Sequence, residues 1–139
     1  MNDKFTKLIE LCKNNIPLTQ ENVGEGMFLV DRGSFQLVIP NNNTDEHGDF
    51  FVYSIEGHDC YSKNIESKHT YHIIDGSGKF IVNGEEKAVN PGDTVVIEPD
   101  TEFTYQGNMI LTFEMEPNFK EENEVKGETI DYSKKNINV

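Results

Sequence analysis

The hydrophobic and polar positions divide the chain into a short amphipathic segment and a long β-patterned region. Four apolar side chains near the start recur at helical spacing: Phe5, Leu8, Ile9 and Cys12. This spacing predicts a helix over residues 3–14 with one buried face. Pro17 ends the pattern, because proline cannot continue a helix. We expect this helix to pack against the outside of a sheet or against a partner subunit.

From Met27 onward, short runs of β-branched and aromatic residues alternate with turn formers. Asn83-Gly84 is the clearest hairpin signal, because both turn positions accept a positive φ. Gly76-Ser77-Gly78 and Gln106-Gly107-Asn108 are also predicted to be turns. Many short strands at regular spacing predict a β-sandwich or barrel. The predicted strands are 27–30, 35–40, 50–55, 59–66, 71–75, 79–82, 86–89, 94–97, 102–105 and 109–116.

The same pattern predicts how the chain is organised. Residues 1–24 form the N-terminal helix and its lead-in, and residues 25–117 form one β-barrel. Beyond Pro117 the sequence is polar, acidic and without periodicity. Residues 118–139 are therefore expected to be an acidic C-terminal extension of the barrel.

One block of motifs carries a resemblance to a known family. It consists of Ile73-Ile74-Asp75-Gly76-Ser77-Gly78, then Asn83-Gly84, then Pro91-Gly92-Asp93-Thr94-Val95-Val96-Ile97-Glu98-Pro99. These segments resemble the motifs of the cupin family, in which glycines permit the tight corners of a small barrel. The resemblance implies an all-β fold, the cupin double-stranded β-helix or jelly-roll barrel, with a short N-terminal helix. It also implies a homodimer formed through sheet edges. It does not imply one activity, because cupins host many.

Cupins usually carry a metal inside the barrel, bound by three histidines and a glutamate. The resemblance places those four positions at Lys63, Ile65, His69 and Phe103. A lysine ammonium has no lone pair at neutral pH, and isoleucine and phenylalanine have no donor atoms. Only His69 can be a ligand, so we expect the usual metal site, and with it a metal cofactor, to be missing.

A rebuilt metal site is the alternative. Zinc or iron could be held by His69, His58 and Cys60. In an unbroken strand, however, His58 and Cys60 point away from Lys63, which the resemblance places inside. His72 lies three residues from His69 and is expected on the opposite face.

Without a metal, the barrel interior can still bind a small molecule. Strand alternation places Tyr71 on the same face as His69, with Phe103 and Tyr105 on the opposing strand. We predict a pocket of these four residues with Lys63 at or near its mouth. A histidine beside a tyrosine hydroxyl can exchange protons with a sugar or keto acid. The competing interpretation is that these side chains only fill the core.

Charge narrows the range of partners. The 139-residue chain has a formal net charge of −13, which argues against nucleic acid and anionic membranes as partners. Arg32 is the sole arginine, so no arginine clamp for phosphates can form. The N-terminus lacks the pattern of a signal peptide and no apolar run is long enough to span a bilayer, so a cytoplasmic location is expected. His47, in a polar loop, is expected to be solvated.

Three functions stay open at this level. The first is a barrel that binds a small molecule, for example a carbohydrate, without the usual metal. The second is an enzyme, either a metal-independent sugar isomerase or epimerase using His69 and Tyr71, or a metal-dependent oxygenase with unusual ligands. The third is a structural or interaction protein whose barrel is filled with side chains.

Overall fold

The computed structural model describes residues 3–132. Among these residues, no helix has the length and apolar character that crossing a membrane requires. The helical elements are η1 (Asp3–Phe5), α1 (Thr6–Lys13), α2 (Gln20–Val23) and η2 (Glu121–Asn123). The strands are β1 (Met27–Asp31), β2 (Phe35–Pro40), β3 (Gly48–Ser54), β4 (Cys60–Asn64), β5 (Lys68–Val82), β6 (Glu85–Val89), β7 (Thr94–Ile97), β8 (Phe103–Glu116) and β9 (Glu124–Thr129).

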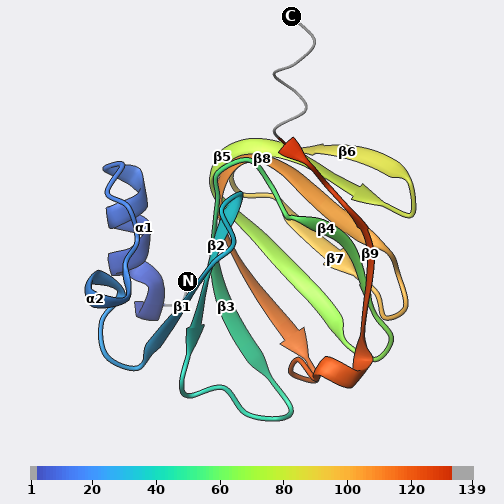
Figure 1. The fold of residues 1–139 in the computed structure, drawn as a ribbon, viewed down its shortest axis with the longest axis horizontal. Coiled ribbons are helices and arrows are strands. Elements are labelled where there is room, and N and C mark those ends of the chain that lie inside the picture. The colour runs from blue at the N-terminus through green and yellow to red at the C-terminus, as the bar shows by residue number, and fades with distance from the viewer. Residues whose placement is uncertain (1–2, 133–139) are drawn as a thin grey trace, which may run out of the picture.

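Two long strands, β5 and β8, form the frame of the barrel. They pair antiparallel from Lys68 opposite Glu116 to Val82 opposite Phe103. The first half of β5 also pairs with β7, and its second half pairs with β6. One half of β8 continues the sheet through β3, β2 and β1, whereas the other half continues it through β4 and β9. The sheet therefore curls around one interior, as Figure 1 shows, and the predicted all-β fold is confirmed.

The two predicted turns within β5 and β8 are wrong. Gly76-Ser77-Gly78 and Gln106-Gly107-Asn108 lie inside continuous strands, where they bend the chain without reversing it. Gly76 and Gly107 have φ values of 79° and 126°. A Cβ atom on Gly76 would lie 2.2 Å from the backbone oxygen of Asn108 on the facing strand. Glycine therefore marks a place where two bent strands approach closely, and this signal does not distinguish a bend from a turn.

The hairpin predicted at Asn83-Gly84 is confirmed, since it joins β5 to β6 with φ values of 51° and 80°. The predicted N-terminal helix is also confirmed. Its four apolar side chains, Phe5, Leu8, Ile9 and Cys12, are buried in a second core on the outer side of the sheet, together with Val38, Phe51 and Ile110. Figure 1 shows α1 beside β1 and β2, outside the barrel.

The C-terminal segment is more ordered than predicted. Within residues 118–132, β9 pairs with β4, with Asn64 opposite Glu124 and Cys60 opposite Thr129. Beyond β9, the buried Tyr132 donates a hydrogen bond of 2.8 Å to the backbone oxygen of His58. The tail prediction is wrong for this strand because most β9 side chains are exposed, so backbone pairing holds the strand without an apolar pattern. Residues 133–139 lie outside the described residues.

The close approach at Gly76 can be tested against Gly33, which also has a positive φ but no atom within 4 Å of the position that a Cβ would take. Gly33→Ala should cost about 1–2 kcal/mol, from the backbone conformation alone. Gly76→Ala should cost roughly 1–3 kcal/mol more, because the methyl group meets the backbone of β8. Urea unfolding of the two variants measures this difference. Equal losses of stability would show that the two strands do not require the close contact.

Candidate functional site

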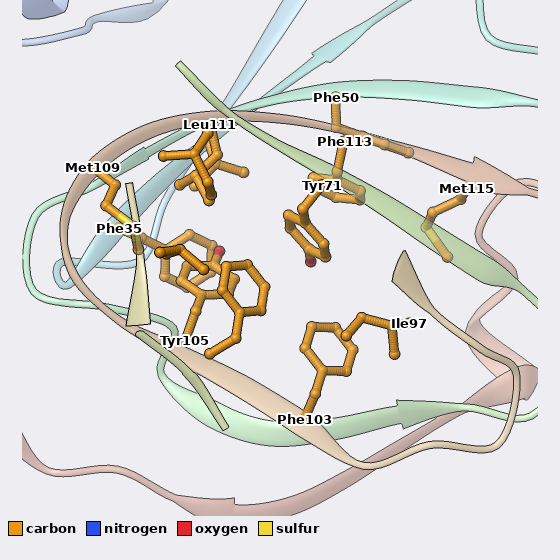
Figure 2. Packing of buried hydrophobic residues seen from close by; sticks show 14 residues of the cluster. Phe35, Phe50, Tyr71, Ile97, Phe103, Tyr105, Met109, Leu111, Phe113 and Met115 are labelled. Atoms are coloured by element: carbon orange, nitrogen blue, oxygen red, sulfur yellow. The ribbon is translucent and has the colours of Figure 1, made fainter. Parts of the chain in front are cut away.

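The barrel encloses a cavity of about 260 Å³, so side chains do not fill its interior completely. Its walls come from both halves of the curled sheet, and aromatic rings dominate them. Figure 2 shows Tyr71, Phe103 and Tyr105 around the same interior space. All five residues predicted for a ligand pocket line this cavity: His69, Tyr71, Phe103, Tyr105 and Lys63. The structure thus brings them together, while their role in ligand binding stays a prediction.

His69 lies deep in the cavity wall and is 7% exposed. Its ring stacks on Tyr71 at 6.0 Å between centroids and meets the edge of Phe103 at 5.3 Å. Its Nδ1 atom is buried and has no hydrogen-bond partner among the described residues. Burial, with a smaller repulsion from His58, lowers the pKa of His69 to about 4. The imidazole is therefore neutral at physiological pH.

Tyr71 and Tyr105 stand side by side in the interior, with ring centroids 5.7 Å apart. They are 3% and 1% exposed. Burial raises the pKa of both hydroxyls well above the usual value, so both stay protonated. Among the described residues, neither hydroxyl has a protein hydrogen-bond partner, although buried tyrosines usually have one. Two protonated donors are thus available to a molecule in the cavity.

His58 is the residue whose importance the sequence did not indicate, because its spacing from Cys60 suggested only a metal ligand. Its imidazole lines the cavity, stacks on Phe35 at 4.9 Å and meets Tyr105 edge-on at 5.3 Å. Its Nδ1 atom lies 2.6 Å from the backbone oxygen of Cys60. A carbonyl oxygen only accepts, and this contact is shorter than the 3.4 Å from the Cys60 backbone N–H to the same Nδ1 atom, so it favours the proton on Nδ1 and the lone pair on Nε2.

Burial lowers the pKa of His58, which keeps its ring neutral, although the Cys60 carbonyl and the nearby Asp59 carboxylate oppose the shift. The backbone of His58 is fixed on two sides. Its N–H donates to the oxygen of Tyr105 at 2.9 Å, and its own oxygen accepts from Tyr132. His58 therefore has a defined position, a defined tautomer and an available lone pair, which are the properties of a general base.

The charged groups around the cavity are mostly paired. Arg32 forms an ion pair with Asp59 at 3.1 Å, and Lys63 forms one with Asp100 at 3.4 Å. Lys126 is a third cation at the cavity wall. The interior itself presents hydrogen-bonding groups and aromatic walls.

The usual cupin metal positions do not fit a metal here. Ile65 is 50% exposed, so the prediction that it points inward is wrong. The inward residues of β4 are Cys60, Ser62 and Asn64, which are all buried. A register shift between Cys60 and Ser62 interrupts the strand, and His58, Cys60 and Lys63 all line the cavity. The alternation along β4 puts Cys60 and Lys63 on opposite faces, as expected, but Cys60 is on the buried one, so the expectation that His58 and Cys60 lie on the side away from the interior is wrong.

The alternative ligand set of His69, His58 and Cys60 is not brought together. Among the described residues, the donor atoms of His58, Asp59 and Cys60 lie within 4.8 Å of one another, and His69 is not part of this group. Burial, with the charge of Asp59, raises the pKa of the Cys60 thiol to about 11, and the carbonyl of Cys60 holds Nδ1 of His58. This donor chemistry does not favour a metal at the cavity wall.

Comparison with known proteins identifies the fold. No protein-family model matches the sequence, and no curated protein matches it. Among solved structures, Pac13 from Streptomyces, described as a unique nucleoside dehydratase, has a TM-score of 0.75 and 24% identity over 78% of this chain and 91% of its own. An RmlC-like cupin from Shewanella frigidimarina has a TM-score of 0.60 and 17% identity, over 70% of this chain and 89% of that one.

KdgF from a Halomonas species is similar at a TM-score of 0.59 and 16% identity, over 68% of this chain and 90% of that one. These likenesses confirm the predicted cupin jelly-roll fold. At such identities they show the fold alone.

Three further Pac13 structures hold uridine and carry one substitution each: a histidine to glutamine, and two tyrosines to phenylalanine. In that sequence the first tyrosine follows the histidine by 13 residues, and the second follows the first by 34. His58, Tyr71 and Tyr105 have the same residue types at the same spacings.

The neutral state of His69 makes a prediction about acid stability. Because its pKa is lowered from 6.5 to about 4, the unfolded chain binds this proton at a higher pH than the folded chain does. Stability should therefore fall as pH drops from 6.5 toward 4, by about 2–3 kcal/mol at pH 4.5. Urea unfolding at pH 7 and 4.5 measures this loss, and His69→Gln should lack that part of it. The same pH dependence in both proteins would contradict the assignment.

Proposed function

We propose that this protein is a metal-independent dehydratase that removes water from an uncharged nucleoside, or a closely related sugar derivative, bound in the barrel. The observation that carries the proposal is the meeting of His58, Tyr71 and Tyr105 in one cavity. His58 offers an oriented base, and Tyr71 and Tyr105 offer protonated hydroxyls that have no hydrogen bond to another described residue. Their types and spacings match the residues substituted in the uridine-bound Pac13 structures, which supports the same assignment.

Size and charge support a small neutral substrate. The cavity of about 260 Å³ lies just below the common range for small-molecule pockets, roughly 300–1,000 Å³. Its aromatic walls suit a planar ring, and two of its three cations, Arg32 and Lys63, are engaged by Asp59 and Asp100. A net charge of −13 disfavours a phosphorylated substrate.

Dehydration by such a site breaks one C–H bond and one C–O bond and forms a carbon–carbon double bond. In the proposed reaction, Nε2 of His58 takes a proton from a carbon next to a carbonyl group. Tyr71 and Tyr105 donate hydrogen bonds to the oxygen on which negative charge develops. The hydroxyl one carbon further leaves as water, with the proton returned by the His58 imidazolium. Atoms and charge balance without another reactant.

Two other enzyme hypotheses are less well supported. An isomerase using His69 requires a base, but His69 has a pKa of about 4 and a buried Nδ1 atom without an orienting partner among the described residues. His69 suits the substrate-binding wall better than proton transfer. A metal-dependent oxygenase requires an internal ligand set, and the donors at the cavity do not fit one.

The proposal predicts the behaviour of three variants. Uridine should stabilise the protein against thermal unfolding. A uridine analogue with a carbonyl next to a C–H bond of its sugar, and a hydroxyl one carbon further, should lose water. His58→Gln should lower kcat about 10²–10⁴-fold, and Tyr71→Phe or Tyr105→Phe about 10²–10³-fold, measured by mass spectrometry of the product.

Tyr53→Phe, which lies in the outer core, is the matched control and should retain full activity. Stabilisation by uridine without turnover of any such analogue would favour a binding protein instead. Turnover that survives in His58→Gln would contradict the role of His58.

The pH profile should show the lowered pKa of His58. Because the neutral imidazole is the base, kcat/KM should be constant near pH 7 and fall only below pH 6.5, as His58 takes up a proton. Initial rates between pH 4.5 and 8 test this. A midpoint above 6.5 would indicate that another group is the base.

A further inference from the structure

A second cluster of chemically active side chains lies on the outer surface, away from the cavity. Asp49 on β3 and Glu114 on β8 are directly opposite each other in the sheet. His72 on β5 lies one strand further, where its neighbour across β8 is Thr112. His47 reaches the same place from the loop before β3. The four side chains are partly exposed, between 18% and 41%.

Their donor atoms already have the spacing of metal ligands. Nε2 of His47 lies 3.1 Å from Oδ1 of Asp49 and 3.7 Å from Oε2 of Glu114. Nε2 of His72 lies 3.0 Å from Oε1 of Glu114. Ligands about 2.0–2.1 Å from a tetrahedral zinc ion lie roughly 3.3–3.4 Å from one another. The observed separations bracket that value, and the donor atoms of His47, Asp49 and Glu114 all lie within 4.8 Å.

The second nitrogen, Nδ1, of each imidazole also has a polar neighbour, in addition to the carboxylates that face Nε2. Nδ1 of His47 lies 3.5 Å from a carboxylate oxygen of Glu116, and Nδ1 of His72 lies 3.5 Å from the hydroxyl of Thr94. Histidines that bind metals commonly have the second nitrogen held by a carboxylate or another polar group. His72 contacts the cluster through Glu114, and a surface hollow lined by Asp49, His72 and Glu114 gives access to it.

The local charge favours a cation. Three carboxylates, Asp49, Glu114 and Glu116, surround the two rings, and Lys4 pairs with one of them at 3.1 Å. The cluster therefore suits a positively charged ligand.

From this geometry we infer that His47, Asp49 and Glu114 form an external binding site for a divalent transition metal such as Zn²⁺, in which His72 holds the Glu114 carboxylate. An imidazole nitrogen together with two carboxylate oxygens suits zinc, cobalt or nickel better than calcium or magnesium, which prefer oxygen ligands alone. Asp49 and Glu114 stand opposite each other on paired strands, so little rearrangement is needed. The site lies on the opposite face of the sheet from the cavity and does not depend on the proposed reaction.

Chelator-treated protein, titrated with Zn²⁺ and Co²⁺, tests this site. Calorimetry should give one ion per chain, and bound Co²⁺ should show the visible absorption of a nitrogen- and oxygen-ligated ion. Glu114→Gln and His47→Gln should each weaken binding at least tenfold. Glu85→Gln, an exposed residue of β6, makes the same charge change and should bind as the parent does.

Circular dichroism of each variant excludes unfolding as the cause, and two independent ligand variants guard against one failing to fold. His58→Gln, a change at the cavity, tests whether the outer site is independent of the cavity and should leave metal binding unchanged. The inference fails if no stoichiometric binding occurs. It also fails if binding is lost in His58→Gln but kept in Glu114→Gln and His47→Gln.

Discussion

The antiparallel pairing of β5 with β8 is the interaction on which the rest of this structure depends. Each strand is long enough to belong to both halves of the sheet, and each bends at glycine so that the sheet can curl. A side chain at Gly76 would collide with the facing backbone, so close approach and curvature have the same cause. The curl creates the interior, and it places Tyr71 of β5 beside Tyr105 of β8 although they are far apart in the sequence.

The interior combines two requirements that oppose each other. Burying aromatic rings stabilises the barrel, whereas burying imidazoles and hydroxyls without partners costs free energy. His69 has a buried nitrogen without a partner among the described residues, and the buried Tyr71 and Tyr105 line the same cavity. Polar groups kept in this state are consistent with a wall that completes its hydrogen bonds with a bound molecule. His58 differs, because backbone contacts fix both its position and its tautomer.

The two faces of the same strands carry different chemistry. On β5, alternation sends His69 and Tyr71 inward and His72 outward, toward Glu114 of β8. The interior has aromatic walls and neutral histidines, while the outer face has carboxylates that attract positive charge. A fold whose usual metal lies inside the barrel is thus represented here by a chain whose proposed metal ligands lie outside it. This division of side chains supports separate roles for the two faces.

The sequence by itself determined the N-terminal helix, the all-β class, the cupin fold and the alternation that directs His69 and Tyr71 inward. These features follow from local periodicity and from side-chain chemistry, which a single chain displays. Only the tertiary structure decided the continuity of β5 and β8, because a glycine-rich segment bends or reverses according to the strand that faces it. It also decided the position of β9, which is held by backbone pairing and leaves no apolar pattern. The roles proposed for His58 and His47 depend on contacts with distant residues, namely Tyr105, Tyr132 and Glu114, that no local pattern predicts.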